Sequence, residues 1–217
     1  MASRFPAARN GLTAFFLAAT IVAVPVPVFA QDSGTAPSKQ QKKLPEAPSK
    51  LPKVGADRAR GLDFLFGALK AAPDEASAKH VEARIWALWT QTPSDTTALL
   101  MSRANAAMGA QHMDVALKLL DAVVKLRPDY VEGWNKRATL YYLQNDYGNS
   151  LKDIEQVLIR EPRHFGALAG LGMIMQALGD EKRALDAFRK ALAVNPHLDK
   201  LPELVKTLSE KVEGRDI

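Results

Sequence analysis

The sequence has 217 residues, enough for one ordinary domain with extensions, and 47% of them are hydrophobic, which is typical of a protein that folds. The lack of cysteine excludes disulfides, thiolate metal sites, a cysteine nucleophile and the lipid anchor of a lipoprotein. The net charge of +5 comes from the N-terminal part of the chain, because positions 61–217 hold 20 basic and 21 acidic side chains, so nucleic acid is not expected as a partner.

Residues 1–30 have the pattern of a secretory signal peptide. Two arginines precede an uncharged apolar run, residues 12–24, which is followed by two prolines and a short segment that ends at Ala30. We expect cleavage after Ala30 and export of the mature chain to the periplasm. The alternative is an uncleaved anchor in the inner membrane, although the apolar run is barely long enough to cross a bilayer.

Residues 31–56 are rich in proline, lysine, serine and glutamine. Such a segment buries too little apolar surface to offset the entropy lost on ordering, so we expect a disordered linker. Its positive charge is spread thinly, and this favours a solvated spacer over stable membrane binding. Contact with a membrane is therefore expected only transiently, or through an uncleaved leader.

Residues 57–92 show apolar side chains at helical spacing in two consecutive stretches, which predicts a pair of helices. Trp86 and Trp89 in the second stretch have two interpretations. They could form an exposed docking site, or they could pack at the core and edge of a terminal repeat. Packing is favoured, because large aromatic side chains are mostly buried.

An internal repeat is the strongest pattern in the chain. Pro128, Pro162 and Pro196 recur at one constant interval, and Pro93 precedes the first of them at almost the same interval. Apolar residues recur at helical spacing in both halves of each unit, so each unit is predicted to be a pair of amphipathic helices. The three aligned units are 97–130, 131–164 and 165–198.

Equivalent positions of the units carry side chains of similar size. The eighth position holds Ala104, Ala138 and Gly172, and the twenty-fourth holds Leu120, Ile154 and Phe188. Small residues allow the two helices of a unit to approach closely. The pairs Asn145-Asp146 and Gly179-Asp180 are predicted to form the turn between the helices, since Asn and Gly adopt the left-handed conformation and Asp caps the next helix.

This pattern resembles the tetratricopeptide repeat (TPR), whose period of about 34 residues equals the interval between the prolines. The third unit matches the family signature at Leu168, Leu171, Gly172, Ala184, Phe188, Ala191 and Pro196. The first two units depart from it at Arg103 and Arg137, where the family prefers leucine.

The resemblance implies an all-α fold, a right-handed α-solenoid of antiparallel helix pairs. Residues 93–201 would form the TPR domain, with 57–92 as a divergent N-terminal unit. Residues 202–217 place apolar side chains on one helical face and charged ones on the other, as a capping helix requires.

No constellation of residues indicates catalysis, so an enzyme is not expected, and neither are a cofactor or a small-molecule substrate. His164 and His197 lie at successive repeat junctions and could approach each other. A weak metal site there is conceivable, but histidines in turns are usually solvated, and no metal site is predicted.

In the TPR family, the first helices of the units line a concave groove that binds a peptide or helix of a protein partner. The resemblance therefore implies a groove that faces such a partner here, with Tyr142 as its aromatic anchor. The family's clamp for a C-terminal carboxylate is absent, because only Asn105 matches its pattern. The predicted groove residues are Met101, Asn105, Met108, Asn135, Lys136, Thr139, Tyr142, Met173 and Gln176, and Leu143 occupies a further groove position.

These features together predict a periplasmic scaffold or adaptor that binds another protein through its groove. The alternative is a structural component of an envelope assembly, held in the inner membrane by its uncleaved leader. A mature chain that begins at Gln31 would exclude the alternative. The sequence does not identify the partner.

Overall fold

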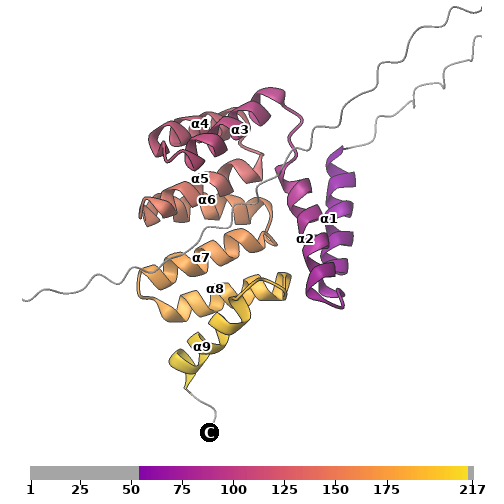
Figure 1. Ribbon diagram of the computed structural model, residues 1–217, viewed down its shortest axis with the longest axis vertical. Coiled ribbons are helices and arrows are strands. Elements are labelled where there is room, and N and C mark those ends of the chain that lie inside the picture. Colours follow the sequence, from indigo (N-terminus) through magenta and orange to yellow (C-terminus); the bar gives the residue numbers. More distant parts are fainter. Residues whose placement is uncertain (1–53, 215–217) are drawn as a thin grey trace, which may run out of the picture. The chain divides into compact units, whose positions relative to one another are not determined.

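The computed structural model describes residues 54–214, and in this range every regular element is an α-helix (Figure 1). The predicted all-α solenoid is confirmed for this part of the chain. The predicted signal peptide and all but the last residues of the predicted linker lie outside it. The helices are α1 (Val54–Lys70), α2 (Glu75–Thr90), α3 (Asp95–Gly109), α4 (Met113–Leu126), α5 (Val131–Leu143), α6 (Tyr147–Arg160), α7 (Phe165–Ala177), α8 (Glu181–Val194) and α9 (Leu201–Glu213).

Three helix pairs, α3–α4, α5–α6 and α7–α8, coincide with the three repeat units. In the third pair, a Cβ atom on Gly172 would lie less than 3.0 Å from the ring of Phe188, so only glycine permits this approach. Phe188 is fully buried, and Ala184 packs beside it in the same core. The alternation of small and large residues in the sequence thus sets the distance between the helices.

The turns inside the repeats form as predicted. Asn145 and Gly179 have positive φ angles of 59° and 80°. Asp146 and Asp180, which follow them, accept hydrogen bonds from backbone N–H groups at the start of α6 and α8. Gln111 occupies the same place in the first repeat with φ of 61°, although its residue type gave no such signal.

Arg137 replaces the leucine of the family pattern, and its charge is neutralised inside the second repeat. Its guanidinium donates two hydrogen bonds of 2.7 and 2.8 Å to the carboxylate of Asp153, and a third of 2.7 Å to Asp121. These bonds raise the pKa of the Arg137 guanidinium above its ordinary value. The departure from the family pattern is therefore compensated by two acidic residues on the adjacent helices.

The last helix, α9, covers the third repeat. Leu201 and Leu208 are buried in the core that also contains Phe188. On the outside, Arg189 of α8 donates to both carboxylate oxygens of Glu213 at 2.5 and 2.6 Å. One apolar face and one charged face are what a terminal cap requires. Across residues 54–214, no helix combines the length and the apolar character needed to cross a membrane.

Candidate functional site

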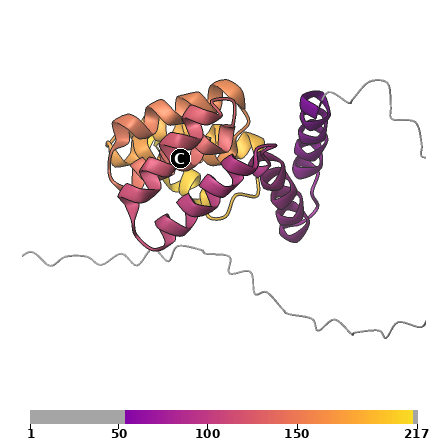
Figure 2. The same cartoon turned by 90° about the horizontal axis from the view of Figure 1, so that it is seen from above.

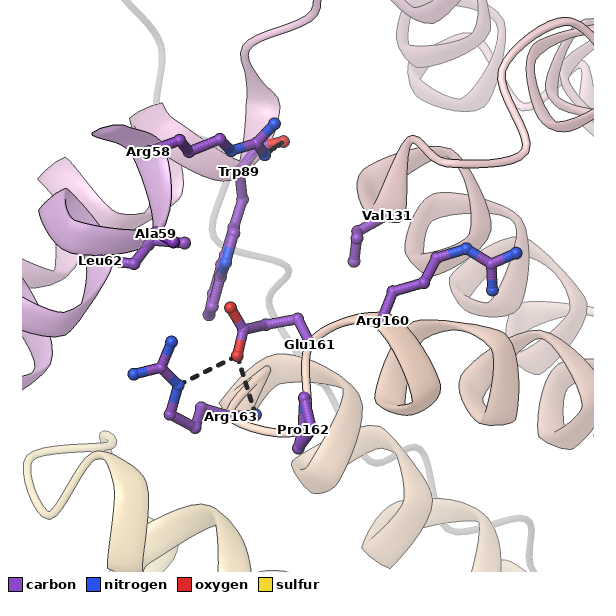
Figure 3. Close-up of a pocket in the computed structure, with 9 residues that line it drawn as sticks. All are labelled: Arg58, Ala59, Leu62, Trp89, Val131, Arg160, Glu161, Pro162 and Arg163. Carbon is purple, nitrogen blue, oxygen red and sulfur yellow. Dashed lines mark hydrogen bonds and ion pairs between the residues drawn. The ribbon is translucent and has the colours of Figure 1, made fainter. Parts of the chain in front are cut away.

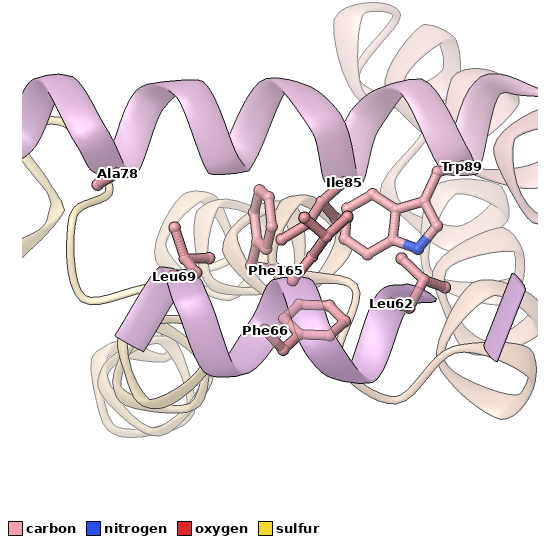
Figure 4. Close-up of a cluster of buried hydrophobic side chains, with 8 residues drawn as sticks. Leu62, Phe66, Leu69, Ala78, Ile85, Trp89 and Phe165 are labelled. Carbon is pink, nitrogen blue, oxygen red and sulfur yellow. The ribbon is translucent and has the colours of Figure 1, made fainter. Parts of the chain in front are cut away.

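The helices α1 and α2 form an N-terminal hairpin with an apolar core of its own. Leu62, Phe66 and Leu69 of α1 pack against Ile85 and Trp89 of α2 (Figure 4). The ring of Phe165, the first residue of α7, reaches into this core and is 1% exposed. The hairpin and the third repeat are therefore built around a shared set of buried side chains.

The final residues of the three repeats, Tyr130, His164 and Leu198, all contact the hairpin. They occupy equivalent positions in successive units. The hydroxyl of Tyr130 donates to the carbonyl of Thr90 at 2.8 Å, and burial raises the pKa of this tyrosine to about 12. His164 stacks on Trp89, and Leu198 packs against the core of the hairpin. The second helix of the hairpin therefore spans three successive repeat junctions.

This arrangement differs from the packing of one repeat on the next. Successive repeats meet through α4 and α5, and then through α6 and α7. The helix α2 instead contacts α5, and in two perpendicular views it lies between α1 and the repeats (Figure 2). The helix pair predicted within 57–92 is present, but it packs along one edge of the repeat stack, beside the junctions between the repeats.

His164 was expected to be solvated, and this prediction is wrong. Its side chain is fully buried, and Nδ1 accepts a 3.1 Å hydrogen bond from the backbone N–H of Ala167, which caps α7. An accepting Nδ1 places the ring proton on Nε2, which lies 3.5 Å from a carboxylate oxygen of Glu132. At that distance Nε2 makes no hydrogen bond with Glu132, which is 2% exposed and accepts two hydrogen bonds from Asn135. The histidine is thus part of a buried polar cluster.

A second polar contact joins the other end of α2 to the third junction. Asn195 is fully buried and donates to Glu82 at 2.9 Å, while its own side-chain oxygen accepts from the N–H of His197. Between the two polar contacts, Trp86 lies against Gly166, where a Cβ atom would be only 3.0 Å from the indole. The glycine therefore leaves space for this tryptophan. The packing interpretation of Trp86 and Trp89 is confirmed, since Trp89 is 1% exposed and Trp86 is half-buried.

The described residues contain no group of three or more side chains able to hold a metal ion. His164 and His197 both lie near α2, but the contacts of His164 are with Trp89 and Glu132. The imidazole of His164 caps α7 through Nδ1 and stacks on the ring of Trp89.

The predicted groove residues fall into three groups. Those with exposed side chains are Asn105, Thr139, Met173 and Gln176; those that are half-buried are Met108, Asn135, Lys136 and Tyr142; and Met101 is buried. Leu143, at the end of α5, is 54% exposed, and Met173 is 38% exposed. The apolar side chains of α5 and α7 that face solvent in this region are therefore Leu143 and Met173.

Two members of the set are occupied by internal contacts. Met101 is 7% exposed and packs in the core of the first repeat beside Ala104 and Leu120, so its prediction as a contact residue is corrected. A flexible methionine fills the space that small neighbours leave. Asn135 uses its amide to hold Glu132.

Tyr142 is only partly available. Its ring lies 5.8 Å from that of Tyr147 on α6, and burial raises the pKa of its hydroxyl. Its role as an anchor, like that of the other accessible residues, stays a prediction.

Sequence reasoning missed Tyr130, His164 and Asn195 as residues that hold the hairpin. A signal was present, because Tyr130 and His164 occupy the same repeat position and both are large. Three units contain different residue types at that position, however, so the periodic pattern gave no indication of a common contact.

Comparison with known proteins agrees with this architecture. A protein-family model described as a tetratricopeptide repeat matches residues 101–152 and, in an overlapping placement, 136–198. A TPR repeat-containing protein of Rhizobium etli is 39% identical over 153 residues, which cover 70% of this chain and 75% of that protein. The chain belongs to the tetratricopeptide-repeat family.

Solved TPR structures share the fold. The TPR domain of Sgt2 from Aspergillus fumigatus matches with a TM-score of 0.52 and 23% identity, over 56% of this chain and 82% of that domain. The first TPR domain of RPAP3, solved with a peptide of HSP90, gives a TM-score of 0.52 and 15% identity, over 56% of this chain and 97% of that one. A TPR fold is a scaffold for protein–protein interaction, and this chain has that fold.

Proposed function

We propose that this TPR protein is an exported scaffold that binds a peptide or helix of a partner protein across the inner faces of α5 and α7. The observation that carries the proposal is the exposure of Leu143 and Met173, which are apolar yet 54% and 38% accessible. Apolar side chains that take no part in a core and lie beside polar groups are typical of a surface that closes around a partner.

The polar residues of this face support the same function. Thr139 and Gln176 are exposed on α5 and α7 and offer a hydroxyl and an amide to the backbone of a bound chain. Thr139 already donates to the carbonyl of Asn135, so its oxygen is left to accept. The RPAP3 domain, which shares the fold, binds a peptide of HSP90, and this supports recognition of a peptide here.

Export is part of the proposal and rests on the sequence of residues 1–30. In this proposal the leader is removed after Ala30, and the mature protein works in the periplasm. The competing possibility is an inner-membrane component with a retained leader. The two possibilities predict different N-termini for the mature chain, Gln31 in the first case and the start of the leader in the second.

The test is photo-crosslinking in a living Gram-negative host that produces the full chain with a photoreactive residue in place of Gln176. We expect a discrete crosslinked protein, and we expect it to be lost when Leu143→Glu and Met173→Glu are combined. Leu126→Glu is the matched control, because Leu126 is 49% exposed at the end of α4 and is not a predicted groove residue.

The outcomes separate the alternatives. An unchanged crosslink in the double variant would overturn the assignment of this face. Sequencing the mature N-terminus in the same sample tests export. A chain that starts at Gln31 supports the periplasmic scaffold, whereas a retained leader favours the anchored component.

A further inference from the structure

A cavity of about 450 Å³ lies where the hairpin meets the junction between the second and third repeats (Figure 3). Its lining comes from both helices of the hairpin, from the start of α5 and from the segment that joins α6 to α7. Leu62, Trp89 and Val131 contribute apolar surface, and three arginines and one glutamate contribute charge. None of the predicted groove residues lines it, so this is a separate site.

One of the three arginines is already neutralised. Arg163 forms an ion pair of 2.6 Å with Asp63 of α1 and a hydrogen bond of 3.1 Å with Glu161. Its guanidinium also lies 4.4 Å from the centre of the Phe66 ring. The contacts with Asp63 and Phe66 of the hairpin therefore hold Arg163 in place at the side of the cavity.

The other two arginines, Arg58 and Arg160, form no ion pair with any residue in the described range. Arg58 donates to the backbone carbonyl of Trp89 at 3.4 Å. Arg160 donates to the backbone and side-chain oxygens of Gln156 at 2.8 and 2.9 Å. Arg160 lowers the pKa of Asp129 at longer range, but the carboxylate of Asp129 is hydrogen-bonded to Arg127. The guanidinium of Arg160 points away from Trp89 (Figure 3) and lies 5.4 Å from the centre of the Trp134 ring, which does not line the cavity. The unpaired positive charge at the cavity is thus that of Arg58.

Trp89 adds a second, independent indication of a ligand. Its side chain is 1% exposed and lines the cavity, and its indole Nε1–H has no hydrogen-bond acceptor among the residues that the structure describes. The indole stands edge-on between Arg58 and Glu161 (Figure 3). A buried donor without an acceptor destabilises the fold, so a bound acceptor at this position would recover stability. The indole N–H lacks an acceptor, and the guanidinium of Arg58 has only the carbonyl of Trp89 as a partner.

We propose that this cavity, which we call the arginine pocket, binds a carboxylate that is attached to a short apolar group. A guanidinium presents two parallel N–H groups that match the two oxygens of a carboxylate. The apolar group then lies against Leu62, Val131 and Pro162. The same chemistry is offered by an aspartate or glutamate next to an apolar residue in a partner protein, and by a free organic acid of similar size.

The test uses two pairs of probes with the full chain. The first pair is 4-methylpentanoate and its neutral amide. The second pair is a peptide with blocked ends, acetyl-Leu-Glu-Leu-amide, and its glutamine counterpart. Binding is followed through the indole N–H signal of Trp89 in ¹⁵N NMR spectra, which Trp86→Phe and Trp134→Phe identify by elimination. We expect saturable shifts with the two acids and none with the neutral members.

Variants locate the site. Arg58→Gln is expected to weaken acid binding about tenfold, as is typical for the loss of a charge-assisted hydrogen bond. Arg103→Gln, an exposed arginine of α3 that does not line the cavity, is the matched control and should bind as the unaltered chain does. Circular dichroism of each variant checks that the helices are retained.

The outcomes test the pocket and distinguish the two sources of the carboxylate. Tighter binding of the peptide than of the small acid identifies a protein segment as the source of the carboxylate, and the reverse identifies a free organic acid; both support the pocket. Equal binding of acids and neutral probes, no shift with either acid, or unchanged affinity in Arg58→Gln would overturn it. Loss of the arginine pocket would leave the function proposed for α5 and α7 untouched, because the two sites share no residue.

Discussion

The imidazole of His164 stacks on the indole of Trp89, with ring centroids 4.1 Å apart and ring planes inclined by 14°. One residue closes the second repeat and the other lies near the end of α2, so the stack joins a repeat junction to the hairpin. Neither side chain is more than 1% exposed. The attachment of the hairpin therefore depends on contacts that can be removed one at a time.

Replacing Trp89 with alanine should lower the free energy of unfolding by about 3–5 kcal/mol, the usual cost of removing a large buried aromatic side chain. The loss should concentrate in the hairpin, so amide exchange should speed up in α1 and α2 before it does in α7 and α8. Phe64→Ala is the control, since Phe64 is 71% exposed on the same hairpin, and its effect should stay within about 0.5 kcal/mol. Equal acceleration in all helices would contradict a hairpin that detaches by itself.

His164 combines two roles that two variants can separate. Asparagine at this position keeps an acceptor for the N–H of Ala167 but removes the stacked ring, whereas alanine removes both. In urea denaturation, the free energy of unfolding of His164→Ala should therefore be lower than that of His164→Asn by about 1 kcal/mol, the usual contribution of a helix cap. Equal midpoints for the two variants would show that the cap contributes nothing.

Two glycines in helices should respond to alanine with opposite sign. Gly172→Ala places a Cβ atom less than 3.0 Å from Phe188 and should cost about 1–3 kcal/mol through overpacking. Gly67→Ala meets no atom within 4 Å on α1 and should stabilise by about 0.5–1 kcal/mol, because alanine is the better helix former. Thermal melting of both variants is the measurement, and a rise in Tm for Gly172→Ala would show that Phe188 can move aside.

The pair formed by Arg137 and Asp153 offers a test of the second repeat. Asp153→Leu leaves the guanidinium without its main partner and should cost about 3–5 kcal/mol. Arg137→Leu combined with Asp153→Leu should recover most of that loss, since leucine is the residue that the family prefers at position 137. Asp121, whose side chain is 52% exposed, is the control, and Asp121→Asn should cost less than about 1 kcal/mol in the same denaturation experiment.

The contact between α9 and α8 should depend on pH. Hydrogen bonds from Arg189, and then from Ser209, lower the pKa of Glu213 to about 2 from an ordinary value of 4.5. A lowered pKa means that the contribution is fully present above about 4.5 and is lost as the pH falls through about 2. Amide exchange at the end of α9 should therefore accelerate over that interval. Glu213→Gln should show fast exchange at neutral pH and little further change, and an identical pH profile in this variant would exclude the carboxylate as the cause.

The repeats could be predicted because their information is periodic. Prolines at a constant interval indicate where each unit ends. Small residues at one repeat position, such as Gly172, indicate where two helices approach closely. Asn145 and Gly179 were identified for the same reason, since their residue types match the conformation that the turn demands. Periodicity also exposed Arg137 as an exception, although not the acidic partners that compensate for it.

The position of the hairpin could not be predicted, because its contacts follow no period. His164 meets Trp89 from two repeats further along the chain, and Asn195 meets Glu82 at a sequence separation of 113. Tyr130 and His164 are equivalent in the repeat yet contact α2 in different ways, one through a hydroxyl and the other through a ring. The arginine pocket was missed for a related reason, since its lining residues, such as Arg58 and Val131, come from segments that lie far apart in the sequence.

The span of α2 across Tyr130, His164 and Leu198 has a consequence for cooperativity. In an ordinary repeat array each unit contacts only its neighbours, so the ends can melt while the middle stays folded. Here a single helix couples the first junction to the third, and a repeat that opens must also break contacts held by the others. As long as the hairpin is attached, the three repeats should therefore unfold together, with the slow assembly that contacts distant in sequence impose.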